Sequence, residues 1–336
     1  MRLCVLLTAS AVAVSLTCCA EPHPERTAAS EEVPLLEPNP IGGPACVELH
    51  LQDGTQLLFA IDTACPSTCV NKTAEPMLGK QISNAEVDSA FYGSLPARTH
   101  QTPAIYLGKT LLIMPRNLYV IDALPNFTKY PQIVGVLGTD CLSNYCVQVD
   151  FPAKKLRLLR REEMQKADLG RVFPMQAQGP GWMIPMPSPI WGRAAFIVDT
   201  GLCGDCDGLL TAKLFRRTIA GLKLHVLSQY TNTTGQTITN FGTSLKIGSS
   251  VRSNILRMAT FPIDFGSTKG TGTLVQFLTA QVGEEAYAEM VFGEEPSRIR
   301  RRANLLGFRF LSRHVATFDF PDRCLYLKHV ERERRQ

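Results

Sequence analysis

The sequence predicts a mainly β protein built from two similar lobes, and three observations support this prediction. Apolar stretches of strand length recur along the chain, and residues 47–61 and 181–198 each have the alternation and central turn of a β-hairpin. Only short stretches, residues 74–78 and 211–220, have a helical character. The same order of motifs occurs twice, with linking segments of different length, as expected of a duplicated domain.

Each half of the chain contains an apolar run that ends in an aspartate. Residues 58–61 lead into an Asp-Thr-Ala sequence that begins at Asp62, and residues 196–198 lead into an Asp-Thr-Gly sequence that begins at Asp199. Such a run predicts a buried strand that carries a carboxylate into a tight turn, where a small residue lets the backbone approach closely. Two such turns suggest that each lobe contributes one acid to a shared site.

Each acid motif is followed by an apolar Leu-Gly pair and then by strand-like sequence around an Asp-Phe-Pro tripeptide. In the first copy the glycine is Gly138 and the tripeptide begins at Asp150. In the second copy they are Gly307 and Asp319. The order of the features is kept while the distances between them vary, so the repeat is one of structure and not of exact spacing.

With these motifs, over roughly residues 44–328, the chain resembles the two-lobed bacterial aspartic proteases of the pepsin-like and retropepsin-like superfamily. The resemblance implies two homologous β-barrel-like lobes, residues 45–165 and 166–330, with the active site between them. It also implies hydrolysis of peptide bonds by a water molecule that the carboxyl groups of Asp62 and Asp199 activate, without a cofactor or a metal. Two carboxyl groups about 3 Å apart share one proton, so one accepts a proton from the water while the other donates.

The same resemblance assigns supporting roles around the two acids. Two hydroxyl groups hydrogen-bond across the lobe interface, two small residues lie beside the carboxylates, and two glycines pack behind the loops. The residues at these positions are Thr63, Thr200, Ala64, Gly201, Gly138 and Gly307. Tyr92 and Gly93 resemble the tip of a flap hairpin that closes on the substrate. The alternative for Tyr92 is a half-buried strand tyrosine at a turn.

The first motif departs from the family pattern because it has Ala64 where glycine is usual. Alanine is strained if the position requires a positive φ and is tolerated otherwise. This departure leaves two functions open. The first is an aspartic endopeptidase, and the second is a non-catalytic relative that binds peptide or protein segments at the same place.

The cysteines favour disulfides and an exported protein. Three of the 11 cysteines lie in the N-terminal segment, and an even number remains after it, which is typical of chains that fold in an oxidising compartment. We expect local disulfides that stiffen the two catalytic loops, Cys65–Cys69 and Cys203–Cys206, and Cys141 and Cys146 form a third close pair. Zinc is disfavoured because no histidine joins these groups, so we expect no metal site.

The N-terminal segment predicts export. Residues 1–20 have a short positive start and an apolar run that is too short to span a bilayer comfortably, as in a signal peptide. The sequence before Cys19 resembles a bacterial lipoprotein box, which would make Cys19 the lipidated residue; the competing interpretation is ordinary cleavage after Ala20. Residues 21–44, rich in proline and glutamate, predict a flexible tether, and residues 331–336 a charged tail.

The overall charge argues against nucleic acid as a partner. The net charge of +5 is small for 336 residues, and much of the excess lies in residues 298–302 and in the tail. We therefore expect a peptide or protein substrate, a location in the bacterial cell envelope or periplasm, and contact with the membrane through the N-terminal lipid. Because both lobes lie on one chain, we expect a monomer.

Overall fold

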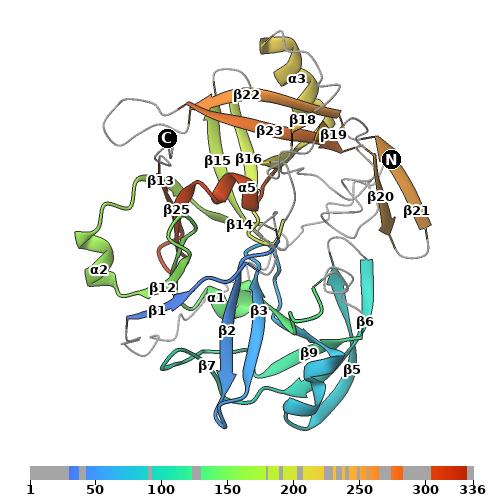
Figure 1. Ribbon diagram of the computed structural model, residues 1–336, viewed down its shortest axis with the longest axis vertical. Coiled ribbons are helices and arrows are strands. Elements are labelled where there is room, and N and C mark those ends of the chain that lie inside the picture. Colours follow the sequence, from blue (N-terminus) through green and yellow to red (C-terminus); the bar gives the residue numbers. More distant parts are fainter. Residues whose placement is uncertain are drawn as a thin grey trace, which may run out of the picture.

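The computed structural model describes the following parts of the chain: residues 30–37, 43–89, 93–122, 130–178, 181–188, 192–202, 207–222, 230–231, 237–238, 242–247, 250–255, 257–264, 274–282 and 304–330. Strands dominate these residues and the helices are few and short (Figure 1). The predicted mainly β class is therefore confirmed.

The first half of the chain forms a nine-stranded sheet. The predicted hairpin is present, and its turn contains Gly54 at φ 87°, a conformation that favours glycine. In sheet order the strands are β5 (Gln81–Ser89), β6 (Gly93–Gln101), β9 (Asn117–Ile121), β4 (Cys69–Asn71), β10 (Gly135–Leu137), β3 (Gln56–Ile61), β2 (Cys46–Leu51), β7 (Ile105–Leu107) and β8 (Thr110–Leu111).

The second half forms a seven-stranded sheet that contains the second predicted hairpin. In sheet order its strands are β14 (Gln176–Gln178), β15 (Gly181–Ser188), β16 (Gly192–Val198), β24 (Asn304–Leu306), β17 (Gly208–Thr211), β23 (Leu274–Val282) and β22 (Arg257–Asp264). Two small hairpins complete this half, namely β18 (Tyr230–Thr231) with β19 (Thr237–Ile238) and β20 (Gly242–Ile247) with β21 (Ser250–Ile255).

The two sheets have the same internal topology. Strand β10 runs parallel to β3 and antiparallel to β4, and β24 has the same relation to β16 and β17. The order β6-β9-β4-β10-β3-β2 in the first sheet therefore corresponds to β22-β23-β17-β24-β16-β15 in the second. The motif repeat in the sequence thus coincides with a repeat of strand order.

A six-stranded sheet joins the two halves, and each half contributes three strands. The halves meet where two strands pair antiparallel, and there the Gln148 amide donates to the hydroxyl of Thr317 at 2.9 Å. In sheet order the strands are β1 (Glu31–Pro34), β12 (Lys155–Leu159), β11 (Cys146–Asp150), β25 (His314–Asp319), β26 (Cys324–His329) and β13 (Arg171–Pro174).

The helices are short and lie between the strands. The predicted helical stretches are present as the 3-10 helix η1 and as α3, in which the buried residues Leu214 and Phe215 face the core. The helices are η1 (Lys72–Met77), α1 (Thr139–Leu142), α2 (Arg161–Lys166), α3 (Ala212–Leu222) and α5 (Phe308–Leu311). No helix in the described ranges is long and apolar enough to cross a membrane.

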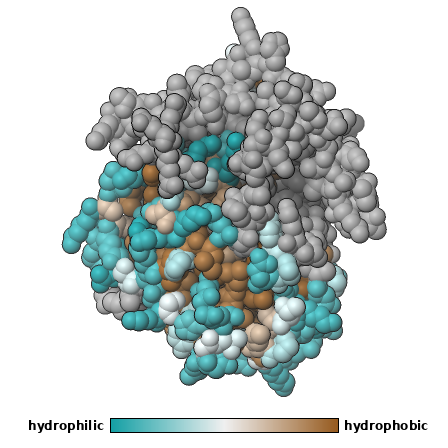
Figure 2. Space-filling view, in the orientation of Figure 1, coloured by the Kyte–Doolittle hydropathy of each residue, from teal (hydrophilic) through white to brown (hydrophobic). Residues whose placement is uncertain are grey.

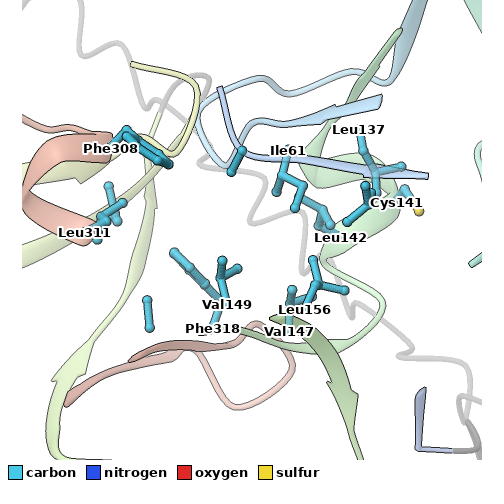
Figure 3. Close-up of a cluster of buried hydrophobic side chains, with 14 of the residues drawn as sticks. Ile61, Leu137, Cys141, Leu142, Val147, Val149, Leu156, Phe308, Leu311 and Phe318 are labelled. Carbon is cyan, nitrogen blue, oxygen red and sulfur yellow. The ribbon is translucent and has the colours of Figure 1, made fainter. Parts of the chain in front are cut away.

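One apolar core extends through both halves and the six-stranded sheet. Figure 3 shows Ile61 and Leu137 from the first sheet, Val149 and Phe318 from the joining sheet, and Phe308 from α5 around one interior. On the outside, Figure 2 shows hydrophobic residues between hydrophilic ones over the lower part of the view, where the first half of the chain lies. The strands that lead into Asp62 and Asp199 therefore end within a shared apolar interior.

Two features of the architecture bear on the expected lobes and tether. The described strands form open sheets with edge strands at both ends, and they form no closed barrel. The flexible tether predicted for residues 21–44 fails where β1 forms, because β1 pairs with β12 along its whole length. Leu35 next to it is only 3% exposed, and Glu32 forms ion pairs with Lys155 and Arg157. The first repeat therefore begins near residue 31 and not at residue 45.

Candidate active site

The two predicted acids occupy equivalent positions at the ends of equivalent strands. Asp62 follows β3, and its N–H donates to the carbonyl of Leu137 at the end of β10 (3.2 Å). Asp199 follows β16, and its N–H donates to the carbonyl of Leu306 at the end of β24 (2.9 Å). The buried strands fix the backbone of each acid, as the apolar runs in the sequence predicted.

Each carboxylate is held by two backbone N–H groups of its own loop. Oδ1 of Asp62 accepts from Ala64 at 2.9 Å and from Cys65 at 3.0 Å. Oδ1 of Asp199 accepts from Gly201 at 2.9 Å and from Leu202 at 2.8 Å. In both loops, backbone N–H groups of the loop therefore orient the Oδ1 oxygen of the acid.

The two loops are joined to each other by their threonines. The N–H of Thr63 donates to Oγ1 of Thr200 (3.0 Å), and the N–H of Thr200 donates to Oγ1 of Thr63 (3.2 Å). The hydroxyl of Thr63 in turn donates to the carbonyl of Val198 (2.6 Å), and that of Thr200 to the carbonyl of Ile61 (2.8 Å). Thr63 is 2% exposed and Thr200 is fully buried. This reciprocal network brings the two halves together at the acids.

The carboxylate of Asp62 lies directly against the loop of Asp199. A Cβ atom on Gly201 would stand 2.4 Å from Oδ2 of Asp62, so only glycine fits there without a shift of the acid. The equivalent Ala64 is not strained by its backbone, because the non-glycine residues with positive φ in the described part of the chain are Lys154 and Arg323. Alanine is therefore tolerated in the first loop.

The environment favours the protonated forms of the two acids. Burial raises the pKa of Asp62, against the effect of the N–H donors of Ala64 and Cys65. Burial raises the pKa of Asp199 well above its usual value, and the nearby charge of Asp62 raises it further. Asp199 is 2% exposed, whereas Asp62 is only partly buried. Both effects oppose ionisation, and they are stronger for Asp199 than for Asp62.

The two predicted supporting glycines lie behind the loops. A Cβ atom on Gly138 would stand 2.7 Å from the carbonyl carbon of Ser67, and one on Gly307 would stand 3.0 Å from the carbonyl oxygen of Leu202. Neither glycine has a positive φ. Both are therefore needed for close approach and not for backbone conformation.

Four residues that the sequence did not point to hold these loops from behind. In the first half, the hydroxyl of Thr68 accepts from the N–H of Gly138 and donates to Asp140. In the second half, the carbonyl of Asp207 accepts from the N–H of Gly307, and its carboxylate pairs with Arg313 at 2.8 Å. The available signal was the second position after each glycine, which is Asp140 in the first copy and Arg309 in the second. This signal finds Asp140 but not Arg313, which lies six positions after Gly307.

The structure describes the two arms of the predicted flap hairpin but not residues 90–92 between them. Strands β5 and β6 pair antiparallel as far as Ser89 and Gly93, and Tyr92 lies outside the described residues. Val87 and Leu95 on the two arms pack against the same apolar cluster as Cys65 of the first catalytic loop. The arms of the hairpin and the loop of Asp62 therefore pack against one apolar cluster.

The cysteines of the described residues are free thiols in this structure. They are Cys46, Cys65, Cys69, Cys141, Cys146 and Cys324. The thiol of Cys65 lies in hydrogen-bond contact with that of Cys69, so the expected disulfide has its two sulfurs together but is not formed. Cys19 and the pair Cys203 and Cys206 lie outside the described residues. Within the described ranges no three or more His, Cys, Asp or Glu residues gather as a metal site.

No protein-family model matches this chain, and no curated protein matches it either.

Proposed function

We propose that this chain is an aspartic endopeptidase of the two-lobed pepsin-like or retropepsin-like kind, with Asp62 and Asp199 as its catalytic pair. The observation that carries the proposal is the reciprocal hydrogen bonding of Thr63 and Thr200, which brings two aspartate loops of the same design together. The matched strand order of the two large sheets and the joining sheet with three strands from each half support the two-lobed architecture.

The different burial of the acids assigns their roles in this proposal. Asp199 is the more buried acid, so it keeps the shared proton, and the partly exposed Asp62 is ionised. Asp62 then accepts a proton from a water molecule as the water attacks the peptide carbonyl carbon, while Asp199 donates its proton to the carbonyl oxygen. Collapse of the tetrahedral intermediate breaks the C–N bond, and a proton passes to the leaving amine.

The hairpin of β5 and β6 supports a peptide or protein as the substrate. An extended peptide needs a cover over the acids, and the two arms of this hairpin pack against the same apolar cluster as Cys65, three residues after Asp62. Tyr92 and Gly93 at its turn are the proposed substrate contacts. A peptide or protein also fits the alternative function, a non-catalytic binder. The binder would use the same surface as the enzyme, but its acids would not cleave the bound peptide.

Export and a place in the cell envelope are part of the proposal. The described chain starts at Ser30, 11 residues after Cys19. A fully extended segment of this length spans at most roughly 40 Å, so a lipid on Cys19 would keep the two lobes close to the membrane. Mass spectrometry of the mature N-terminus, with Cys19→Ser beside the wild type, distinguishes lipidation from cleavage after Ala20.

Cleavage of a diverse peptide mixture by the full chain tests the catalytic proposal. Asp62→Asn and Asp199→Asn should each lower the rate by about 10²-fold or more, because each variant removes one partner of the acid–base pair. The matched control is Asp53→Asn, which changes an exposed acid that only orders its own turn. If the wild type binds peptides without cutting them, and the Asn variants bind equally well, the binding function is correct instead.

A further inference from the structure

An ion pair between a buried aspartate and a partly exposed arginine lies directly behind the second catalytic loop. The carboxylate of Asp207 is completely buried and accepts a hydrogen bond from Nη2 of Arg313 at 2.8 Å. Nε of Arg309 stands 4.0 Å from the same carboxylate oxygen. Removing a single partner from a buried pair leaves an uncompensated charge, so such a pair is sensitive to substitution on either side.

The ion pair is one of several contacts around the end of β24, the strand that supports Asp199. The carbonyl of Asp207 accepts from the N–H of Gly307, and the adjacent Leu306 carbonyl accepts from the N–H of Asp199. The N–H of Phe308, at the start of α5, donates to the carbonyl of Leu202 in the catalytic loop at 2.9 Å. Arg313 follows the same helix and returns to Asp207. The short segment around Gly307 is therefore fixed on both sides.

In the first half, a different pair of residues holds the loop of Asp62 from behind. There, the N–H and hydroxyl of Thr68 both donate to the carboxylate of Asp140, which belongs to helix α1. In the second half the acid is on the loop and the cation follows the helix. The acid of the pair is thus on the helix in the first half and on the loop in the second half. Its partner is a threonine in the first half and an arginine in the second.

We propose that Asp207 and Arg313 are a positioning pair that fixes the Asp199 loop against β24 and α5 and that balances the charge behind this acid. The inference rests on the proposed catalytic role of Asp199. Neither residue touches the reacting atoms, so both act through the backbone of Gly307 and Phe308 and through their charge.

The charge of Arg313 matters because two buried carboxyl groups flank the same strand. Asp199 already faces the charge of Asp62, and Asp207, whose carbonyl accepts from Gly307 behind the same loop, would add a second negative charge when it loses its bond to Arg313. Nε of Arg309 stands 4.0 Å from the same oxygen, which is too far to replace the 2.8 Å bond of Arg313. Loss of Arg313 should therefore raise the pKa of Asp199 further.

The experiment compares the pH dependence of peptide cleavage for Arg313→Met, Arg313→Lys and the double variant Asp207→Asn/Arg313→Met. Arg313→Met should lower kcat/KM by about tenfold or more through misplacement of the loop. It should also move the high-pH limb, which reports loss of the shared proton, upward by about one pH unit. Arg313→Lys should keep the wild-type limb, and the double variant should restore it because no buried charge remains.

Arg161→Met is the matched control, since it removes an arginine from an exposed ion pair with Asp322 and should change neither rate nor pH profile. A purely structural role would lower the thermal stability of Arg313→Met while its kcat/KM and pH limb stay at wild-type values, and that result overturns the proposal. If the wild type shows no cleavage, the carbon-13 titration of the Asp199 carboxyl group in wild type and Arg313→Met still decides the charge effect. An unchanged titration would overturn the inference independently of the proposed function.

Discussion

Thr63 and Thr200 hydrogen-bond to each other in both directions, and each hydroxyl then donates to a carbonyl of the opposite half. The backbone of each aspartate loop is therefore held by the side chain of the other loop. All of these groups are buried, so water cannot replace a missing partner. The position of the acids thus depends on both threonines together.

Loss of one threonine hydroxyl should weaken the protein and the site together. Thr200→Val leaves the N–H of Thr63 and the carbonyl of Ile61 without their partner, and each such group costs about 1–3 kcal/mol. Thr200→Ser keeps the hydroxyl and loses only a methyl group. We expect a fall of about 2–4 kcal/mol in the free energy of unfolding for the valine variant, and a clearly smaller fall for serine. Denaturant unfolding and peptide cleavage measure both; equal stability of the two variants would contradict the network.

The first loop has Ala64 where the second has Gly201, and we expect activity to respond differently to exchanging alanine and glycine at these two positions. Gly201→Ala should abolish most activity, because the new Cβ would stand 2.4 Å from the carboxylate of Asp62 and displace it. Ala64→Gly should keep activity, because Ala64 has no positive φ to relieve. Its cost is about 0.5–1 kcal/mol of unfolding free energy from the more flexible unfolded chain. A large gain in activity for Ala64→Gly would mean that the methyl group obstructs the site.

The features that follow from local pattern were predictable from the sequence. The two hairpins and the position of each acid follow from apolar runs that end abruptly at Asp62 and Asp199. The close packing of Gly138 and Gly307 followed from the resemblance of the Leu-Gly pairs. The sequence pattern was clear because these strands are buried on both sides, which requires continuous apolar sequence.

Features that depend on distant partners were not predictable. Strand β1 has glutamates and a proline, which is the composition of a linker, and it is a strand only because β12 supplies its hydrogen-bond partners and Lys155 and Arg157 its counter-charges. Pro34 is compatible with this edge position because an edge strand pairs on one side only. The pairing of Asp207 with Arg313 likewise joins residues whose relation is set by the fold alone.

The close approach of the Cys65 and Cys69 thiols predicts that oxidation can join them. With glutathione disulfide as oxidant, the two thiols should give up two hydrogens and form one S–S bond, while the glutathione disulfide is reduced to two thiols. Because the bond closes a very short loop, we expect only a small rise in melting temperature. Thiol counting and mass spectrometry measure this; Cys65→Ser and Cys69→Ser should each prevent it. Cys141→Ser is the control and should leave it intact, and a wild type that keeps both thiols would refute the expectation.

His50 predicts a pH dependence of stability that is separate from the catalytic acids. Its Nε2 lies 2.6 Å from the carbonyl oxygen of Gly108, and its Nδ1 lies 3.1 Å from that of Leu51. Carbonyl oxygens only accept, so both ring nitrogens can donate only when the imidazole is protonated. These two hydrogen bonds, the one to Gly108 first, raise the pKa of His50 above its usual value.

A raised pKa in the folded state means that protonation stabilises the fold. The contribution of His50 is then complete below the pKa of the unfolded chain, near 6.5, and it disappears as the pH rises through the higher pKa of the folded protein. His50→Gln should therefore lose more unfolding free energy relative to wild type near pH 5 than near pH 9. Denaturant unfolding at both pH values measures the difference. A loss of the same size at both would show that the imidazole is neutral in the folded protein and bonds through one nitrogen only.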